Sequence, residues 1–348
     1  MPAKAPRTAA DIHIAIICAL PLEATAVQGI LDADHKHIRP DPADDNSYTV
    51  GSIGEHHVVV VHLSGVAGVP DATAAEQIKS SFPDIRLALV SGICGAVPRY
   101  TAPFEAKERY IHLGDLVIST LLVQVDTGIE TDSRLDGSDW AEDNLDRPSR
   151  LIDSLLAKLQ TKRHRSELAQ EVSKMLHILG RQDEDCIYPG YKSDILFKSS
   201  YMHKHQAAAG CKKCQSGKLE SCEKARLTLC TQLGCSLAAS EIRPARPSLD
   251  GNGMYQPDVH LGRISTGHRV IRSAVYRDSL AETLGVCAFE MGGGNAWGLY
   301  PCLVIKGVSD YADSHKSYQW QLYAAAVAAA GLKVLLLDHW LDQSLSPP

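Results

Sequence analysis

The residue best suited to chemistry is Asp310, at the end of the segment Lys306-Gly307-Val308-Ser309-Asp310. It follows an apolar run, residues 303–308, of the kind found in strands buried on both faces. Desolvation there would favour the protonated carboxyl group, which a general acid needs. Open α/β sheets also place ligands just past the carboxyl ends of their strands. The alternative is a helix N-cap, a position that Asp favours.

A cysteine-rich stretch offers metal ligands. In chain order it contains His203, His205, Cys211, Cys214, Cys222, Cys230 and Cys235. Four thiolates, or three thiolates and a histidine, can hold a tetrahedral structural zinc ion. The expected ligand set is Cys211, Cys214, Cys222 and Cys230. Free thiols in a surface insert are the alternative, and the chemistry at Asp310 is expected to need no cofactor.

Alternating strand and helix patterns must position these side chains. The expected strands are residues 12–18, 48–50, 57–63, 87–91 (followed by a glycine-rich turn, 92–95), 115–125 (a candidate strand pair), 260–264 and 303–308. The expected helices are residues 22–31, 71–82, 151–159, 273–284 and 321–337. This order is typical of one three-layer α/β/α domain. We place it at 11–340, with the polar, cysteine-containing insert at 190–258.

Charge and hydropathy argue against two classes of partner. The chain has 348 residues, a formal net charge of −6 and 6% aromatic residues, so a nucleic-acid-binding face is not expected. No run approaches the roughly 20 apolar residues of a membrane span. The first ten residues carry no apolar leader segment. We therefore expect a cytoplasmic protein that acts on a small molecule.

Four segments, taken in order, resemble the nucleoside phosphorylase superfamily, which includes the methylthioadenosine/S-adenosylhomocysteine nucleosidases. They are residues 14–23; 65–68 with 91–97; 113–119; and 266–268 with 289–291 and 307–310. The chain is most similar to the nucleosidase-like domains of filamentous fungi. The resemblance implies a central mixed, partly barrel-like sheet, a nucleoside-like substrate and a homodimer or larger homo-oligomer.

The resemblance also implies a mechanism, the hydrolysis of an N-glycosidic bond. Asp310 would protonate N7 of the leaving purine, and Glu23 would orient the attacking water. The alternative for Glu23 is a solvated first-turn residue stabilised by the helix dipole. The residues expected around the substrate are Glu290, Met291, Gly292, Ser309, Gly92, Ile93, His268 and Val270. For His268 a surface turn, and for Val270 ordinary core packing, are the alternatives.

Two departures from the family pattern bear on the substrate. Ile93 and Val90 stand where phosphorylases have a serine and an arginine, and Arg86 is out of phase, so water is the expected nucleophile. Gly292 replaces the glutamate that binds the ribose hydroxyls, so Glu290 or Asn295 would have to take over that contact. Two further functions stay open: acid/base chemistry on a non-nucleoside intermediate of secondary metabolism, and a non-catalytic ligand-sensing module.

Overall fold

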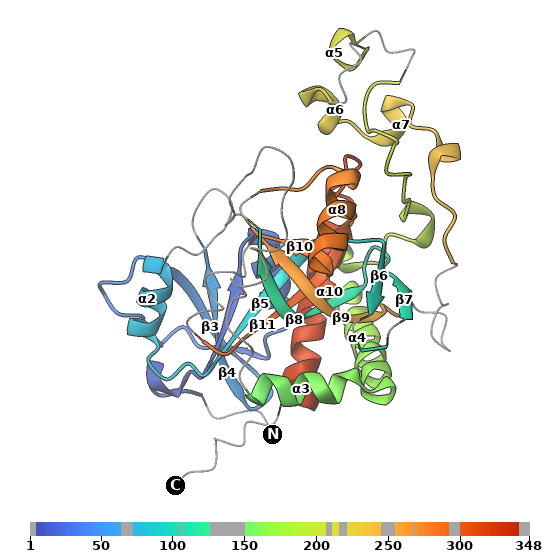
Figure 1. The fold of residues 1–348 in the computed structure, drawn as a ribbon. Coiled ribbons are helices and arrows are strands. Elements are labelled where there is room, and N and C mark those ends of the chain that lie inside the picture. Colours follow the sequence, from blue (N-terminus) through green and yellow to red (C-terminus); the bar gives the residue numbers. More distant parts are fainter. Residues whose placement is uncertain are drawn as a thin grey trace.

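A mixed sheet forms the centre of the molecule (Figure 1). The computed structural model describes residues 5–63, 72–102, 104–105, 107–125, 150–206, 211–215, 221–244, 255–267, 269–291 and 300–340. The sheet's strands among these are β1 (Ile14–Cys18), β2 (Ala33–Asp34), β3 (Ser47–Ile53), β4 (His56–His62), β5 (Leu87–Ala96), β8 (Leu116–Gln124), β9 (Val259–Thr266), β10 (Val286–Glu290) and β11 (Cys302–Asp310). A separate hairpin consists of β6 (Arg99–Ala102) and β7 (Lys107–Tyr110).

Part of the sheet closes on itself. Its order is β10-β9-β8-β11-β5-β1-β4-β3-β2, and β10 pairs with β5 as well as with β9. The β10–β5 pairing is antiparallel and sets Phe289 opposite Gly95, whereas β10 and β9 run parallel. Five strands, β10, β9, β8, β11 and β5, therefore form a barrel-like ring from which the others extend. The expected α/β class and partly barrel-like mixed sheet are confirmed.

Several of the described helices pack against the sheet, and three short ones lie away from it. Their bounds are α1 (Pro21–Gly29), α2 (Ala72–Ser81), α3 (Arg150–Gln160), α4 (Lys162–Gln182), α5 (Lys212–Gln215), α6 (Glu223–Arg226), α7 (Cys230–Leu233), α8 (Ala274–Leu284) and α10 (Gln321–Val334). Helix α10 lies directly on β11, where a Cβ atom at Gly307 would stand 1.9 Å from the carbonyl oxygen of Ala324. The glycine before Ser309 and Asp310 is therefore what lets this helix approach the strand.

Among the described residues, one helical segment has the length and apolar composition of a membrane span, Gln321–His339. It contains α10, and 78% of it is buried inside the protein. Its alanine-rich middle packs against β11, β5 and α1. Core packing thus accounts for its hydropathy.

The structure changes three of the expected strand boundaries. The segment 92–95 is no turn, because β5 continues through it while pairing with β11 and β10. Residues 115–125 hold one strand, β8, in place of a pair. Residues 286–290, which carry no expected strand, form β10. In each case pairing with a distant strand decides the outcome.

The polar region between α4 and β9 extends away from the sheet. Its short helices α5, α6 and α7 lie beyond the end of α8 (Figure 1). It returns to the sheet at β9, which starts at Val259. The domain limits 11–340 and the insert limits 190–258 stay predictions.

Candidate active site

Asp310 and Glu23 line one cavity of about 320 Å³. Glu23 lies in the first turn of α1, directly after β1, and Asp310 is the last residue of β11. Strand β5 runs between these two strands. The cavity thus lies at the carboxyl ends of parallel strands, where α/β sheets commonly bind ligands.

The segment 92–95 of β5 separates the two carboxylates. A Cβ atom at Gly92 would stand 2.0 Å from Oε1 of Glu23. A Cβ atom at Gly95 would stand 2.8 Å from Oδ1 of Asp310. Each glycine therefore leaves room for one carboxylate, and the two acidic groups lie at opposite ends of the same four residues.

Backbone amides hold the Glu23 carboxylate. Its Oε2 accepts hydrogen bonds from the N–H groups of Ala19 (2.8 Å) and Leu20 (2.9 Å). Its Oε1 accepts one from the N–H of Ile93 (2.8 Å). With 2% of the residue exposed, Glu23 is not a solvated first-turn residue, although it does cap the start of α1. The three donors fix the carboxylate at the cavity wall.

Asp310 is equally well fixed. Its Oδ1 accepts a hydrogen bond from the N–H of Ala312 (2.9 Å). Its Oδ2 accepts hydrogen bonds from the Ser309 hydroxyl (2.8 Å) and from Nζ of Lys316 (2.6 Å). The next described helix, α10, begins only at Gln321, so Asp310 is not a helix N-cap. The sequence did not predict a role for Lys316, because a lysine in a polar loop has no local pattern that indicates its partner.

A second buried ion pair contributes to the wall. Nζ of Lys306 lies 3.4 Å from Oε2 of Glu290, with both side chains at most 2% exposed. Burial alone would lower the pKa of Lys306, but the negative charges of Glu290 and Glu23 outweigh it and raise that pKa. The sequence did contain a signal here, since a lysine inside the apolar run 303–308 needs a buried counter-charge.

The structure brings most of the other expected residues to this cavity. Ile93, Ser309, Met291 and Val270 line it together with Glu290. Val270 is 50% exposed, which excludes ordinary core packing. Gly92 lies behind the Glu23 carboxylate. Gly292, His268 and Asn295 lie outside the described residues.

The positions that hold a serine and an arginine in phosphorylases carry the apolar residues Ile93 and Val90 here. Ile93 presents an apolar side chain to the cavity, and its N–H donates to Glu23. Arg86 precedes β5, so it lies at the opposite end of that strand from Ile93, roughly 20 Å away at the usual strand rise. Three cationic side chains line the cavity: Lys306 and Lys316 each face a carboxylate, and Arg269 is exposed.

The cysteines of the insert fall into two groups. Cys211, Cys214 and Cys222 gather with His205, and their ligand atoms lie within 4.8 Å of one another. Cys230 does not join them: its Sγ lies 3.4 Å from Nδ1 of His203. The expected set with Cys230 as fourth ligand is thus replaced by one with His205. The reason is that α7 turns Cys230 toward the other histidine.

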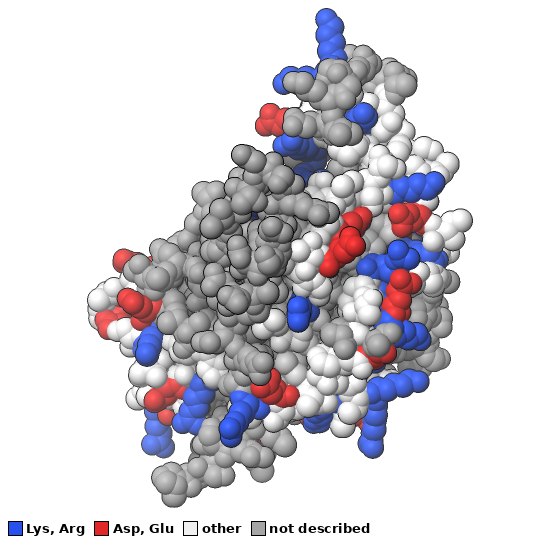
Figure 2. Space-filling view, viewed as in Figure 1, with Lys and Arg blue, Asp and Glu red and all other residues white. Residues whose placement is uncertain are grey.

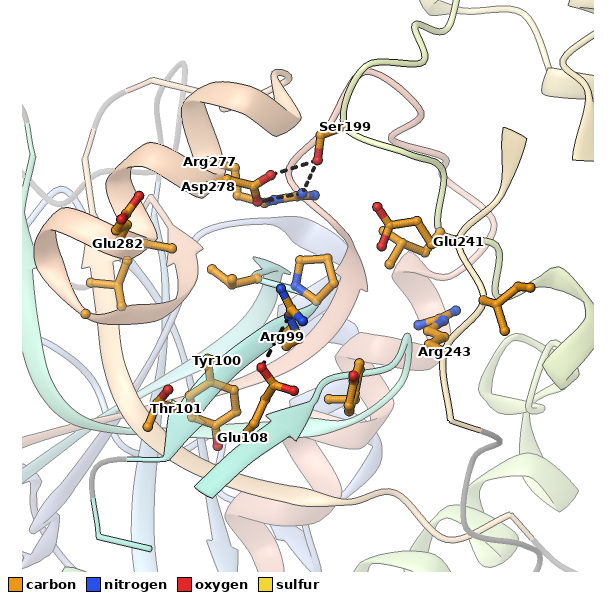
Figure 3. Close-up of a pocket in the computed structure, with 18 residues that line it drawn as sticks. Arg99, Tyr100, Thr101, Glu108, Ser199, Glu241, Arg243, Arg277, Asp278 and Glu282 are labelled. Carbon is orange, nitrogen blue, oxygen red and sulfur yellow. Dashed lines mark hydrogen bonds and ion pairs between the residues drawn. The ribbon is translucent and has the colours of Figure 1, made fainter. Parts of the chain in front are cut away.

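A larger cavity, of about 740 Å³, lies between the β6–β7 hairpin, α8 and the end of the insert (Figure 3). Two ion pairs lie in its lining: Arg99 with Glu108 (3.5 Å), and Arg277 with Asp278 (2.7 Å). Ser199 also donates to Asp278. Neither site carboxylate lines this cavity, so the smaller cavity is the candidate active site.

Figure 2 shows basic and acidic side chains interspersed over the described part of the visible face. They lie on both the sheet-bearing body and the insert. Such mixing differs from the continuous basic stripe that backbone-phosphate binding needs. The surface charge of this face therefore does not indicate nucleic-acid binding, and the smaller cavity remains the candidate functional site.

Comparisons of the sequence with known proteins find two kinds of relative. No protein-family model matches the chain. A nucleotide-binding leucine-rich repeat (NLR)-like protein of Hyaloscypha variabilis is 32% identical over 331 residues, which are 94% of this chain and 29% of that protein. The 5'-methylthioadenosine/S-adenosylhomocysteine nucleosidase of Mycobacterium tuberculosis is 33% identical over 91 residues, 25% of this chain and 36% of that enzyme. The matches span about a third of these relatives' length.

Solved structures extend the likeness to the whole fold. The 5'-methylthioadenosine/S-adenosylhomocysteine nucleosidase of Helicobacter pylori has a TM-score of 0.51 at 15% identity, with 93% of this chain and 97% of that chain covered. Futalosine hydrolase of the same organism has a TM-score of 0.50 at 15% identity and the same coverage. The chain therefore has the fold that these two nucleosidases share. This fold agrees with the resemblance seen in the four sequence segments.

Proposed function

We propose that this chain hydrolyses the N-glycosidic bond of a purine-nucleoside-like substrate. One observation carries the proposal: two buried carboxylates, Glu23 and Asp310, line one cavity at opposite ends of the segment 92–95. The cavity volume of about 320 Å³ is at the small end of the range typical for ligand sites. Hydrolysis of such a bond needs one group to position water and one to protonate the leaving base.

Glu23 is suited to the first role. A carboxylate offers roughly four acceptor directions, and backbone amides occupy three of them. The remaining direction, on Oε1, can accept a hydrogen bond from a water molecule. The water oxygen then attacks the anomeric carbon of the sugar, and its proton passes to the carboxylate and on to solvent.

Asp310 is suited to the second role. When the carbon–nitrogen bond breaks, its electron pair stays with the base, and a proton from Asp310 completes the neutral leaving group. Lys316 can supply that proton to Asp310, because its Nζ donates a hydrogen bond to Oδ2 of Asp310. The 2.6 Å contact between Lys316 and Asp310 thus belongs to the proton-donating machinery.

The neighbouring side chains suggest how the nucleophile is chosen. Ile93 replaces a phosphate-binding hydroxyl, and the Ile93 amide is engaged by Glu23. Two of the three cationic side chains that line the cavity, Lys306 and Lys316, are engaged by Glu290 and Asp310, whereas the third, Arg269, is exposed to solvent. These contacts support water over phosphate as the nucleophile.

A second candidate function is ligand binding without turnover. The observation that favours it is the 32% identity, over 94% of this chain, to a protein named as NLR-like. A module of that kind would use the same cavity to hold a nucleoside-like molecule. Glu23 and Asp310 would then serve as hydrogen-bonding groups for the ligand.

The decisive experiment measures base release from adenosine, inosine and methylthioadenosine, each with and without phosphate. We expect phosphate-independent release that falls by roughly 10²- to 10⁴-fold in Asp310→Asn. The exposed Asp338→Asn is the matched control and keeps full activity. Tight binding without base release, unaffected by Asp310→Asn, would favour the second candidate. If the chain bound none of the three compounds and released base from none of them, the nucleoside proposal would be contradicted altogether.

A further inference from the structure

The described residues of the insert form no hydrophobic core of useful size. Its helices α5, α6 and α7 span four residues each, and helices this short are unstable by themselves. The buried cluster that joins them consists of Cys214, Ala225 and Leu233 with three partly buried cysteines. Small units of this kind usually need a disulfide or a metal ion to fold. All cysteines of the chain are free, which leaves the metal ion.

The first cysteine group already has the dimensions of a zinc site. Sγ of Cys211 and Sγ of Cys222 lie 3.9 Å apart. Nδ1 of His205 lies 3.5 Å from Sγ of Cys214 and 3.6 Å from Sγ of Cys222. A tetrahedron with usual zinc–sulfur and zinc–nitrogen bonds has edges of about 3.8 and 3.6 Å. The N–H of Ala225 also points at Sγ of Cys222 (3.4 Å), as an amide does beside a thiolate.

The second group is built around His203. Its Nε2 faces the carbonyl oxygens of Ala225 (3.0 Å) and Thr228 (2.9 Å). Since carbonyl oxygens only accept, Nε2 carries the proton and Nδ1 carries the lone pair. That lone pair faces Sγ of Cys230 (3.4 Å) and Sγ of Cys235 (3.8 Å). A ligating histidine whose other nitrogen donates to a backbone carbonyl is the usual arrangement at a metal.

A fourth ligand comes from outside the insert. The ligand atoms of His315, His203 and Cys235 lie within 4.8 Å of one another, and Cys230 joins this set through its contact with His203. Nε2 of His315 is buried and has no hydrogen-bond partner among the described residues. The His315 ring is held flat against Phe197, with centroids 4.0 Å apart. A buried nitrogen without a donor or acceptor is costly, and a bound cation removes that cost.

We propose that the insert binds two zinc ions, and that the second ion fastens the insert to the active-site loop, the segment 311–316 that follows Asp310. The first site consists of His205, Cys211, Cys214 and Cys222. The second site consists of His203, Cys230, Cys235 and His315. Soft thiolate and imidazole ligands in a tetrahedral set select zinc over calcium or magnesium. This inference goes beyond the proposed function and does not depend on it.

The second site has a consequence for Asp310. His315 is the residue before Lys316, whose Nζ contacts Asp310 at 2.6 Å. The same loop is held at Ser314, whose hydroxyl accepts a hydrogen bond from the N–H of His203 (3.0 Å). A zinc ion on His315 therefore fixes the segment 311–316 against the insert. The second ion is a positioning element for the candidate active site, whereas the first only folds the insert.

Elemental analysis of the purified full chain tests the number of sites. We expect two zinc ions per chain, and one in His315→Phe, which keeps the stacking on Phe197 but removes the ligand nitrogen. Cys211→Ser should also retain one ion, and Cys186→Ser, at a half-buried cysteine outside both groups, should retain two. If the unaltered chain bound one zinc ion and His315→Phe bound the same number, the second site would be overturned. No bound zinc, or disulfides among these cysteines, would overturn both.

Hydrogen exchange tests the coupling to the active-site loop without any assay of turnover. In His315→Phe we expect exchange of the amides at 312–316 to rise at least tenfold, and in Cys211→Ser to stay within twofold of the unaltered protein. Equal exchange of this loop in both variants would refute the claim that the second ion fastens it. Because neither readout uses a substrate, failure of the nucleosidase proposal leaves these results interpretable.

Discussion

The close approach of Glu23 to β5 makes Gly92→Ala the sharpest test of the site's construction. The added Cβ atom would stand 2.0 Å from Oε1 and 2.3 Å from Cδ of Glu23, whereas ordinary contact begins at 3.4 Å. The carboxylate must therefore retreat by about 1.4 Å. The hydrogen bond from the Ile93 amide, now 2.8 Å, would lengthen to about 4 Å and break.

The expected cost is large for a single methyl group. Each hydrogen bond to a buried carboxylate contributes about 1.5–3 kcal/mol, and Glu23 accepts three from backbone amides. Losing one and distorting two predicts a loss of roughly 3–5 kcal/mol in the free energy of unfolding. The matched control is Gly29→Ala in α1, where the new Cβ has nothing within 4 Å and should stabilise by about 0.5–1 kcal/mol.

Urea unfolding measures these free energies, and a double-mutant cycle isolates the cause. In a Glu23→Ala background the carboxylate that the new methyl group would strike is absent, so Gly92→Ala should cost clearly less there. What remains is the strain of placing alanine at a φ of +158°, about 1–3 kcal/mol. An equal cost in both backgrounds would show that the carboxylate is not the cause of the loss. A Gly92→Ala protein within about 0.5 kcal/mol of the unaltered one would refute the reasoning.

Two further predictions concern buried charge. Lys306→Met removes the cation 3.4 Å from the buried Glu290 and should cost about 3–5 kcal/mol in urea unfolding. Lys306→Met together with Glu290→Gln should cost clearly less, and equal costs would contradict a coupled pair. Burial lowers the pKa values of His35 and His57 below 6.5, so the unfolded chain binds more protons and the free energy of unfolding should fall as pH drops from 6.5. His57→Phe should flatten that fall and the exposed His177→Asn should not, as unfolding curves at several pH values would show.

Much of the fold and part of the site could be predicted from the sequence alone. The apolar run before Asp310 and the order of the four family segments indicated a buried strand that ends at a ligand site, and the structure shows a buried strand that ends at a cavity. Such signals are local, because strand and helix periods are written in neighbouring residues. The cysteine spacing likewise indicated a metal-binding insert, but spacing could not pair each thiol with its histidine.

Only the tertiary structure decided which distant groups meet. Glu23 receives the amide of Ile93, 70 positions along the chain. Lys316 turns back onto Asp310, and His315 onto His203. These contacts depend on strand register and on the closure of the ring by β10, which no local pattern specifies. The sequence determined that Asp310 ends a buried strand; the packing of five paired strands determined which charges surround it.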